Sequence, residues 1–194
     1  MAFTVKVAAT GLCVLALVAS VQAQSVPKTA VTGVPPFVLG TPVSTVLRAN
    51  PSFRQSAETC VPQGKTENYV GKVTAPIGRY AYIADALLCF YKGSLAVIRL
   101  TWSSAAFRDS VEEWRSSSQA LARQLTTSYA PELIKRNFID EDMGGRIEIQ
   151  DDQANTLTMV ANSTNEDALS ISVWYVAASY GHGVNGVGPA VGPY

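Results

Sequence analysis

The segment 168–177 shows the cleanest two-residue alternation of side chains in the sequence, and this pattern constrains the fold more than any other in the chain. Its apolar positions are Leu169, Ile171, Val173 and Tyr175, and the positions between them carry Ser170, Ser172 and Trp174. Successive side chains of a strand point to opposite faces of a sheet, so the segment is predicted to be a strand with one buried face. The chain must then supply a second layer that covers this face.

Five further strands and two helices are predicted around this strand. The strands are expected at 79–84, 87–91, 95–102, 146–150 and 155–161, with a hairpin turn at Lys92-Gly93. A short helix is predicted over 42–49, with Thr41 as its N-cap, and a long helix from 105 or 109 to 129, where Asp109 and Glu112 resemble a capping box.

This order predicts the fold class. Because the strands follow one another over short turns, we expect an α+β fold whose mainly antiparallel sheet has about six strands, with one long and one short helix. The same order permits a doubled helix-plus-meander unit. Residues 53–78 are broken by Pro and Gly and show no sustained period, and 133–138 are expected to form one more helical turn.

The N-terminus resembles an export signal. Lys6 precedes an apolar stretch, and the small residues Val21 and Ala23 suit cleavage before Gln24. We therefore expect a signal peptide at 1–23, a linker at 24–36, a single domain at 37–180, a Gly/Pro-rich flexible tail at 181–194, and a periplasmic or secreted location. The alternative is an uncleaved anchor, although the stretch is short for a membrane span.

Two cysteines remain once the signal has been removed, since Cys13 lies within it. In an oxidising compartment, Cys60 and Cys89 are expected to form a disulfide. The alternatives are a catalytic thiol, a metal-binding pair or two idle thiols. The chain has no Cys-x-x-Cys motif, and its single histidine, His182, lies between glycines in the tail.

Charge and motifs exclude several classes of function. The chain has 15 Lys and Arg residues against 15 Asp and Glu residues, which argues against a polybasic nucleic-acid binder. It contains no nucleophile elbow, phosphate-binding loop, dinucleotide fingerprint or zinc-protease motif. We therefore expect no nucleic-acid partner, no cofactor and no enzymatic activity.

An acidic cluster is the best available metal site. Asp140, Asp142 and Asp151 match positions one, three and twelve of a calcium-binding loop, with Gly145 at position six. Gly144 at position five has no side-chain oxygen, and the segment after it is predicted to be a strand. The alternative, a solvated turn followed by a hairpin loop, fits the sequence better.

Aromatic residues beside the last strand predict a binding surface. If Leu169, Ile171, Val173 and Tyr175 fill the core, Trp174 lies on the opposite sheet face, together with Val97 and with Tyr180 beyond it. Aromatic residues on an open sheet face are typical of a protein-binding or ligand-binding surface. The alternative is that the short helix at 42–49 covers them.

The stretch from Phe37 to Leu47 carries a resemblance. Its apolar start, Gly40 and capped short helix look like the entry helix of small exported bacterial proteins. The element order resembles the β-lactamase-inhibitor-protein-like fold and the small outer-membrane-assembly lipoproteins of the SmpA/OmlA type. This resemblance implies a noncatalytic binding module, but the chain lacks a lipidated cysteine, and no binding residues carry over.

These observations predict an exported noncatalytic binding or accessory protein of the bacterial cell envelope, with an envelope protein as its partner and no transmembrane segment after signal cleavage. One alternative is a structural or cell-surface protein. Another is a small hydrolase or metal-dependent enzyme that uses the acidic cluster.

Overall fold

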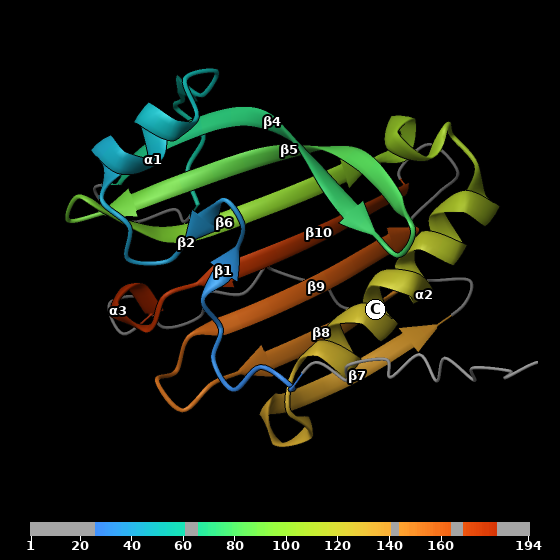
Figure 1. Cartoon of the computed structure of the whole chain (residues 1–194). Coiled ribbons are helices and arrows are strands. Elements are labelled where there is room, and N and C mark those ends of the chain that lie inside the picture. The colour runs from blue at the N-terminus through green and yellow to red at the C-terminus, as the bar shows by residue number, and fades with distance from the viewer. Residues whose placement is uncertain (1–25, 61–65, 141–143, 164–168, 182–194) are drawn as a thin grey trace, which may run out of the picture.

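A computed structural model of the chain describes residues 26–60, 66–140, 144–163 and 169–181. Its main feature is an eight-stranded antiparallel sheet in the order β3-β4-β5-β6-β10-β9-β8-β7 (Figure 1). The strands are β3 (Arg54–Gln55), β4 (Glu67–Ile77), β5 (Tyr80–Tyr91), β6 (Ser94–Ser103), β7 (Ile134–Asp140), β8 (Gly144–Gln150), β9 (Thr156–Ser163) and β10 (Leu169–Val176). The predicted α+β class and antiparallel sheet are confirmed, but the predicted number of six strands is wrong.

The sheet consists of two series of consecutive strands that meet in the middle. Strands β3 to β6 follow helix α1 (Val43–Ala49), and strands β7 to β10 follow helix α2 (Val111–Ser128). Strand β10 lies between β6 and β9, with Val173 paired to Leu100 on one side and to Met159 on the other. The order of a helix followed by strands therefore occurs twice, with four strands in each series.

Two tight turns build the long hairpins of the first series. Tyr91 pairs with Ser94 across Lys92 and Gly93, whose φ angles are 51° and 78°, so the predicted hairpin is confirmed. Ile77 pairs with Tyr80 across a second turn, where Gly78 has a φ of 60° and a Cβ would lie 3.2 Å from that of Ala120. This hairpin includes β4, which lies in the stretch that the sequence analysis expects to be irregular.

Helix α2 begins one residue later than its predicted capping box implies. Its N-cap is Ser110, whose Oγ accepts a hydrogen bond of 3.2 Å from the backbone N–H of Glu113. A 3₁₀ helix, η1 (Ser104–Phe107), precedes α2, and a second, η2 (Pro131–Leu133), follows it. Helix α1 also begins one residue later than expected, because Pro42 rather than Thr41 is its N-cap.

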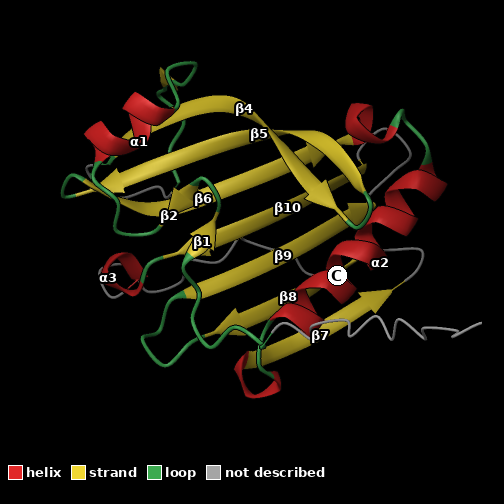
Figure 2. Cartoon of the chain, in the orientation of Figure 1, coloured by secondary structure: helices red, strands yellow, loops and turns green. Residues whose placement is uncertain are grey.

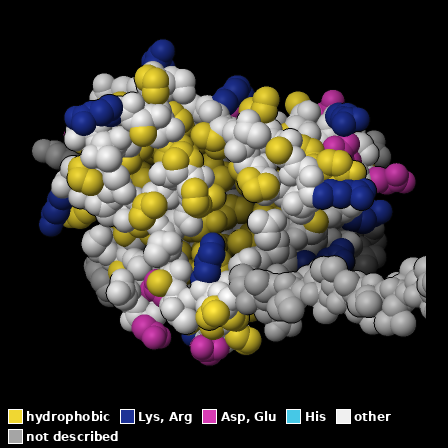
Figure 3. Space-filling model, in the orientation of Figure 1, with side chains coloured by type: hydrophobic (Ala, Val, Ile, Leu, Met, Phe, Trp, Pro, Cys, Tyr) yellow, Lys and Arg dark blue, Asp and Glu magenta, His cyan; other side chains and the backbone are white. Residues whose placement is uncertain are grey.

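Both helices cover the same face of the main sheet (Figure 2). The helix side chains Trp114, Leu121, Leu125 and Val46 join the apolar row of β10 in one large core. The indole N–H of Trp114 donates a 3.1 Å hydrogen bond to the carbonyl of Ser170, which ties the helix to the central strand. On this face, hydrophobic side chains gather between the helices and charged side chains lie nearer its edges (Figure 3).

The segment before α1 also packs on the domain, which corrects the expectation of a linker at 24–36. Residues Gly33–Val34 (β1) pair with Phe37–Val38 (β2) in a small two-stranded sheet, and Val31 is buried. The N–H of Val31 donates to the Asp151 carboxylate at 2.8 Å, and the N–H of Lys28 donates to the carbonyl of Ser128. The signal at 1–23 and almost all of the tail at 181–194 lie outside the described residues.

Two further local expectations differ from the structure. The predicted strands at 79–84 and 87–91 form one continuous strand, β5. The segment 133–138, expected to form one more helical turn, lies almost entirely in β7 (Ile134–Asp140), which pairs with β8. The prediction of one long and one short helix is incomplete, because a third helix, α3 (Ala178–Gly181), ends the described chain. None of the helices in the described ranges is long and apolar enough to cross a membrane.

Candidate functional site

A groove forms where β5 extends beyond its neighbour β6. The pairing of these strands ends at Asp85 and Thr101, and Ser103 of β6 remains paired with Ser170 of β10. The β5 segment Tyr80–Ala84 continues with only β4 at its side. Beyond this point the chain of β6 turns away into η1 and α2. The strands β5 and β6 therefore diverge, and the space between them is the fork groove.

The groove in this fork has a volume of about 970 Å³. One wall is the β4–β5 hairpin and the other is the turn from β6 through η1 into the first two turns of α2. Its lining residues are Lys72, Arg79, Tyr80, Ala81, Tyr82, Ile83, Asp85, Ser103, Ala105, Ala106, Arg108, Ser110, Glu112, Glu113 and Ser116. Tyr80 is 54% exposed and Ile83 is 61% exposed, so two large hydrophobic side chains face solvent here. A concave site of this size is typical of ligand binding.

The second wall is shaped by an unusual backbone turn. Arg108 and Asp109 have φ angles of 53° and 55°, a left-handed conformation that non-glycine residues rarely adopt. These two residues turn the chain between η1 and α2, and Ser110 then caps the helix. Consecutive left-handed residues carry strain that the surrounding structure must offset, and such strain is concentrated at functional sites.

A group of hydrogen-bonded side chains joins the two walls of the groove. The Tyr82 hydroxyl donates to Glu113 Oε1 at 3.1 Å and accepts from Ser117 Oγ at 3.2 Å, while the Tyr82 ring packs 5.5 Å from that of Phe107. Burial raises the pKa of Tyr82, Ser117 lowers it and Glu113 raises it, with a net upward shift. The phenol therefore stays protonated, and its two hydrogen bonds connect the β4–β5 hairpin to α2.

The charges around the groove balance. The basic residues are Lys72, Arg79 and Arg108, and the acidic residues are Asp85, Glu112 and Glu113. Lys72 forms a 2.7 Å ion pair with Asp85, Arg108 lies 3.9 Å from Glu113, and the Arg79 guanidinium lies 4.9 Å from the centre of the Tyr80 ring. The groove has no net charge that would select an anionic or a cationic ligand.

The predicted aromatic surface is only partly exposed. Trp174 does lie on the face opposite the core row, where the Arg99 guanidinium stacks 5.2 Å from its ring centre. Val97 is 0% exposed and Tyr180 is 3% exposed, so neither belongs to an open surface. Helix α1, the predicted cover, packs in the other core. Val97 instead belongs to a second buried cluster, which includes Tyr180 of α3 and the cysteines Cys60 and Cys89.

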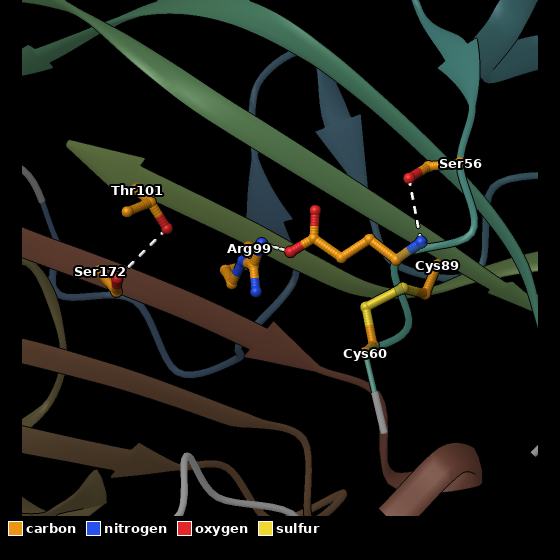
Figure 4. Close-up of polar contacts among 7 residues, drawn as sticks. Ser56, Cys60, Cys89, Arg99, Thr101 and Ser172 are labelled. Carbon is orange, nitrogen blue, oxygen red and sulfur yellow. Dashed lines mark hydrogen bonds and ion pairs between the residues drawn. A yellow bond between two sulfur atoms is a disulfide. The ribbon is translucent and has the colours of Figure 1, made fainter. Parts of the chain in front are cut away.

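The predicted disulfide is confirmed, and it anchors this second face (Figure 4). Cys60 and Cys89 are bonded with their Cα atoms 6.3 Å apart, and both sulfurs join a small buried cluster. Glu58, two residues before Cys60, forms an ion pair with Arg99 of β6. The bonded cysteines hold structure and leave no free thiol at these two positions.

The three acidic candidates do not assemble. Asp140 ends β7 and pairs with Gly144, whereas Asp151 follows the opposite end of β8, and a seven-residue strand is roughly 20 Å long. The Asp151 carboxylate accepts hydrogen bonds from the backbone of Val31, Gln153 and Asn155, which accounts for its burial. Asp142 lies outside the described residues. Within the described ranges, no group of three potential metal ligands occurs.

Sequence reasoning misses the groove, although it places a strand at 79–84. The sequence shows that Tyr80 and Tyr82 lie on one face of this strand and that Ala81 and Ile83 lie on the other, so large apolar side chains are present on both faces. The sequence does not show that β5 separates from β6 at this point. That separation depends on the pairing of Ser103 with β10, about 70 residues later in the chain.

Comparison with known proteins identifies no relative. A scan against protein-family models finds no match, and neither does a search of curated proteins or of solved structures. The function proposed below therefore rests on the residues and the geometry of this chain.

Proposed function

We propose that this chain is an exported, noncatalytic binding or accessory protein of the bacterial cell envelope, with the fork groove, lined by Tyr80–Ile83 and by η1–α2, as its binding site. The observation that carries the proposal is the exposure of Tyr80 and Ile83 on the walls of a groove of about 970 Å³. Exposed aromatic and aliphatic residues beside a concavity are typical anchors of a protein interface.

The polar groups of the groove favour binding over catalysis. The Tyr82 hydroxyl is engaged by Glu113 and Ser117, and the Ser110 hydroxyl accepts a helix-capping bond. Catalysis by a nucleophile needs a base aimed at it, and these groups instead hold the two walls together. The envelope location rests on the sequence of the signal at 1–23 and agrees with the presence of a disulfide.

The experiment compares capture of envelope proteins by the exported full chain and by two variants. Tyr80→Ala combined with Ile83→Ala removes both exposed anchors of the groove. Phe138→Ala is the matched control, because Phe138 is 63% exposed on β7 at the far edge of the sheet. We expect wild type and the control to retain the same partner, and the groove variant to lose it.

Equal capture by all three proteins would contradict the proposed site. Thermal unfolding of the groove variant provides the folding control, because truncating exposed side chains should change stability by less than about 1 kcal/mol. The mass of the exported chain tests the location, since cleavage before Gln24 removes residues 1–23.

A further inference from the structure

The backbone of β5 presents an unpaired edge along the groove. Ile77 and Tyr80 close a two-residue turn, so they form a hydrogen-bonded pair, and Tyr82 and Ala84 follow in the same alternation toward β4. The N–H and C=O groups of Ala81 and Ile83 then point away from β4, into the groove. No strand pairs with them among the residues that the structure describes.

This edge borders the groove of about 970 Å³, whose other wall is the turn from β6 through η1 into α2. In an ordinary hairpin β6 would continue beside Ala84 and Ile83, but its chain leaves toward η1 and α2. The resulting groove is bordered by a strand edge on one side and by a helix start on the other. If two copies paired through this edge, both of their η1–α2 walls would have to lie at the same interface, since each edge is bordered by that wall.

We propose that the groove binds an extended polypeptide segment of a partner protein, which adds to the sheet as a strand beside Tyr80–Ala84 of β5. The proposal deepens the binding function given above and rests on it. An extended backbone is the chemistry that satisfies a row of alternating N–H and C=O groups, and strand addition is a common way to recognise peptides. The five residues of the free edge span roughly 16 Å, enough for a matching segment of about five residues.

Side chains of the groove define which segments fit. A strand beside β5 places alternate side chains on the two faces of the sheet, one set toward Tyr82 and Ala106 and the other toward Ile83. Tyr82 and Ile83 both offer apolar contact, so each set should contain an apolar residue. Because the basic and acidic groups around the groove balance, the segment needs no net charge, and its affinity should depend little on salt.

The test uses a displayed library of random nine-residue linear peptides, selected on the full exported chain. A selected peptide should protect the amide hydrogens of Ala81 and Ile83 from exchange with solvent. Methylation of alternate backbone nitrogens of the peptide should weaken binding by about tenfold in one register and little in the other, because only one set of N–H groups faces β5. This arm needs no variant of the protein.

Variants of Ala81 test the edge from the protein side. Ala81→Pro removes the outward N–H without breaking a bond to β4, whereas Ala81→Ser keeps it. We expect the proline variant to bind a selected peptide about tenfold more weakly and the serine variant to bind within about twofold of wild type.

The outcomes separate the binding mode from the function. Strand addition is overturned if no peptide is selected, if a bound peptide leaves exchange at Ala81 and Ile83 unchanged, or if these amides are already protected in the free protein. Protection that appears only on self-association would assign the edge to a second copy instead. If Ala81→Pro still captures the envelope partner while the Tyr80 and Ile83 variant does not, the groove functions without an added strand.

Discussion

Reduction of the Cys60–Cys89 disulfide should lower the free energy of unfolding by about 3.6 kcal/mol. The bond closes a loop with a sequence separation of 29 residues. For a loop of this length, the chain-entropy relation says that the disulfide lowers the conformational entropy of the unfolded chain by about 12 cal/mol/K. This corresponds to about 3.6 kcal/mol of stability at 25 °C. The folded state should lose little, because both cysteines are buried in the cluster with Val97 and Tyr180.

The assay is urea unfolding followed by tryptophan fluorescence, with and without reductant. With a urea dependence of about 2 kcal/mol/M, the midpoint should fall by about 2 M on reduction. The matched control is the double variant Cys60→Ala, Cys89→Ala, which should resemble reduced wild type and should not respond to reductant. A midpoint shift below about 0.5 M, or uptake of two alkyl groups by the unreduced denatured protein, would refute the reasoning.

The remaining predictions concern the sheet, the tail and pH. Ile171→Ala should cost roughly 2 to 5 kcal/mol in urea unfolding, because Ile171 is fully buried, whereas Trp174→Ala should cost about 1 kcal/mol or less; equal losses would mean that both faces are packed alike. Deleting 181–194 should change stability by less than about 1 kcal/mol, and a larger drop in a thermal melt would show that this segment docks. Burial, and then the charge of Asp151, raise the pKa of Tyr129 to about 12, so the folded state binds more protons than the unfolded state above about pH 10. Stability should therefore fall as pH rises from about 10 to 12, and Tyr129→Phe should reduce that slope; an unchanged slope would exclude Tyr129 as the cause.

The sequence predicts those elements whose pattern is local. Strand β10 alternates cleanly, and the Lys92-Gly93 turn has the residues that its backbone requires, so both can be identified without tertiary information. Strand β4 cannot, since Gly71 and Pro76 interrupt its pattern. Gly71 is explained only by the fold, because a Cβ there would lie 2.8 Å from the Phe53 ring.

Non-local pairing accounts for the other differences. Residues 134–140 have no strong strand pattern, and their pairing with β8 makes them a strand. Alternation correctly assigns Trp174 to the face opposite the core, but it does not say what covers Val97, because the cover comes from distant segments around Cys60 and Tyr180. The groove cannot be predicted from the sequence for the same reason. It forms because β6 stays paired with β10 after its pairing with β5 has ended.

The central position of β10 has a consequence for how the chain acquires its fold. Strand β10 is the last strand in sequence among the described residues, yet it joins the two halves of the sheet. Until it is available, the first half ends in an open β6 edge and the second in an open β9 edge, so neither can complete its core. Assembly must therefore wait for contacts between residues about 70 positions apart, which favours slow folding and a single late commitment step. Before that step the inner edges of both halves are unpaired, and an unpaired strand edge is prone to pairing with another chain.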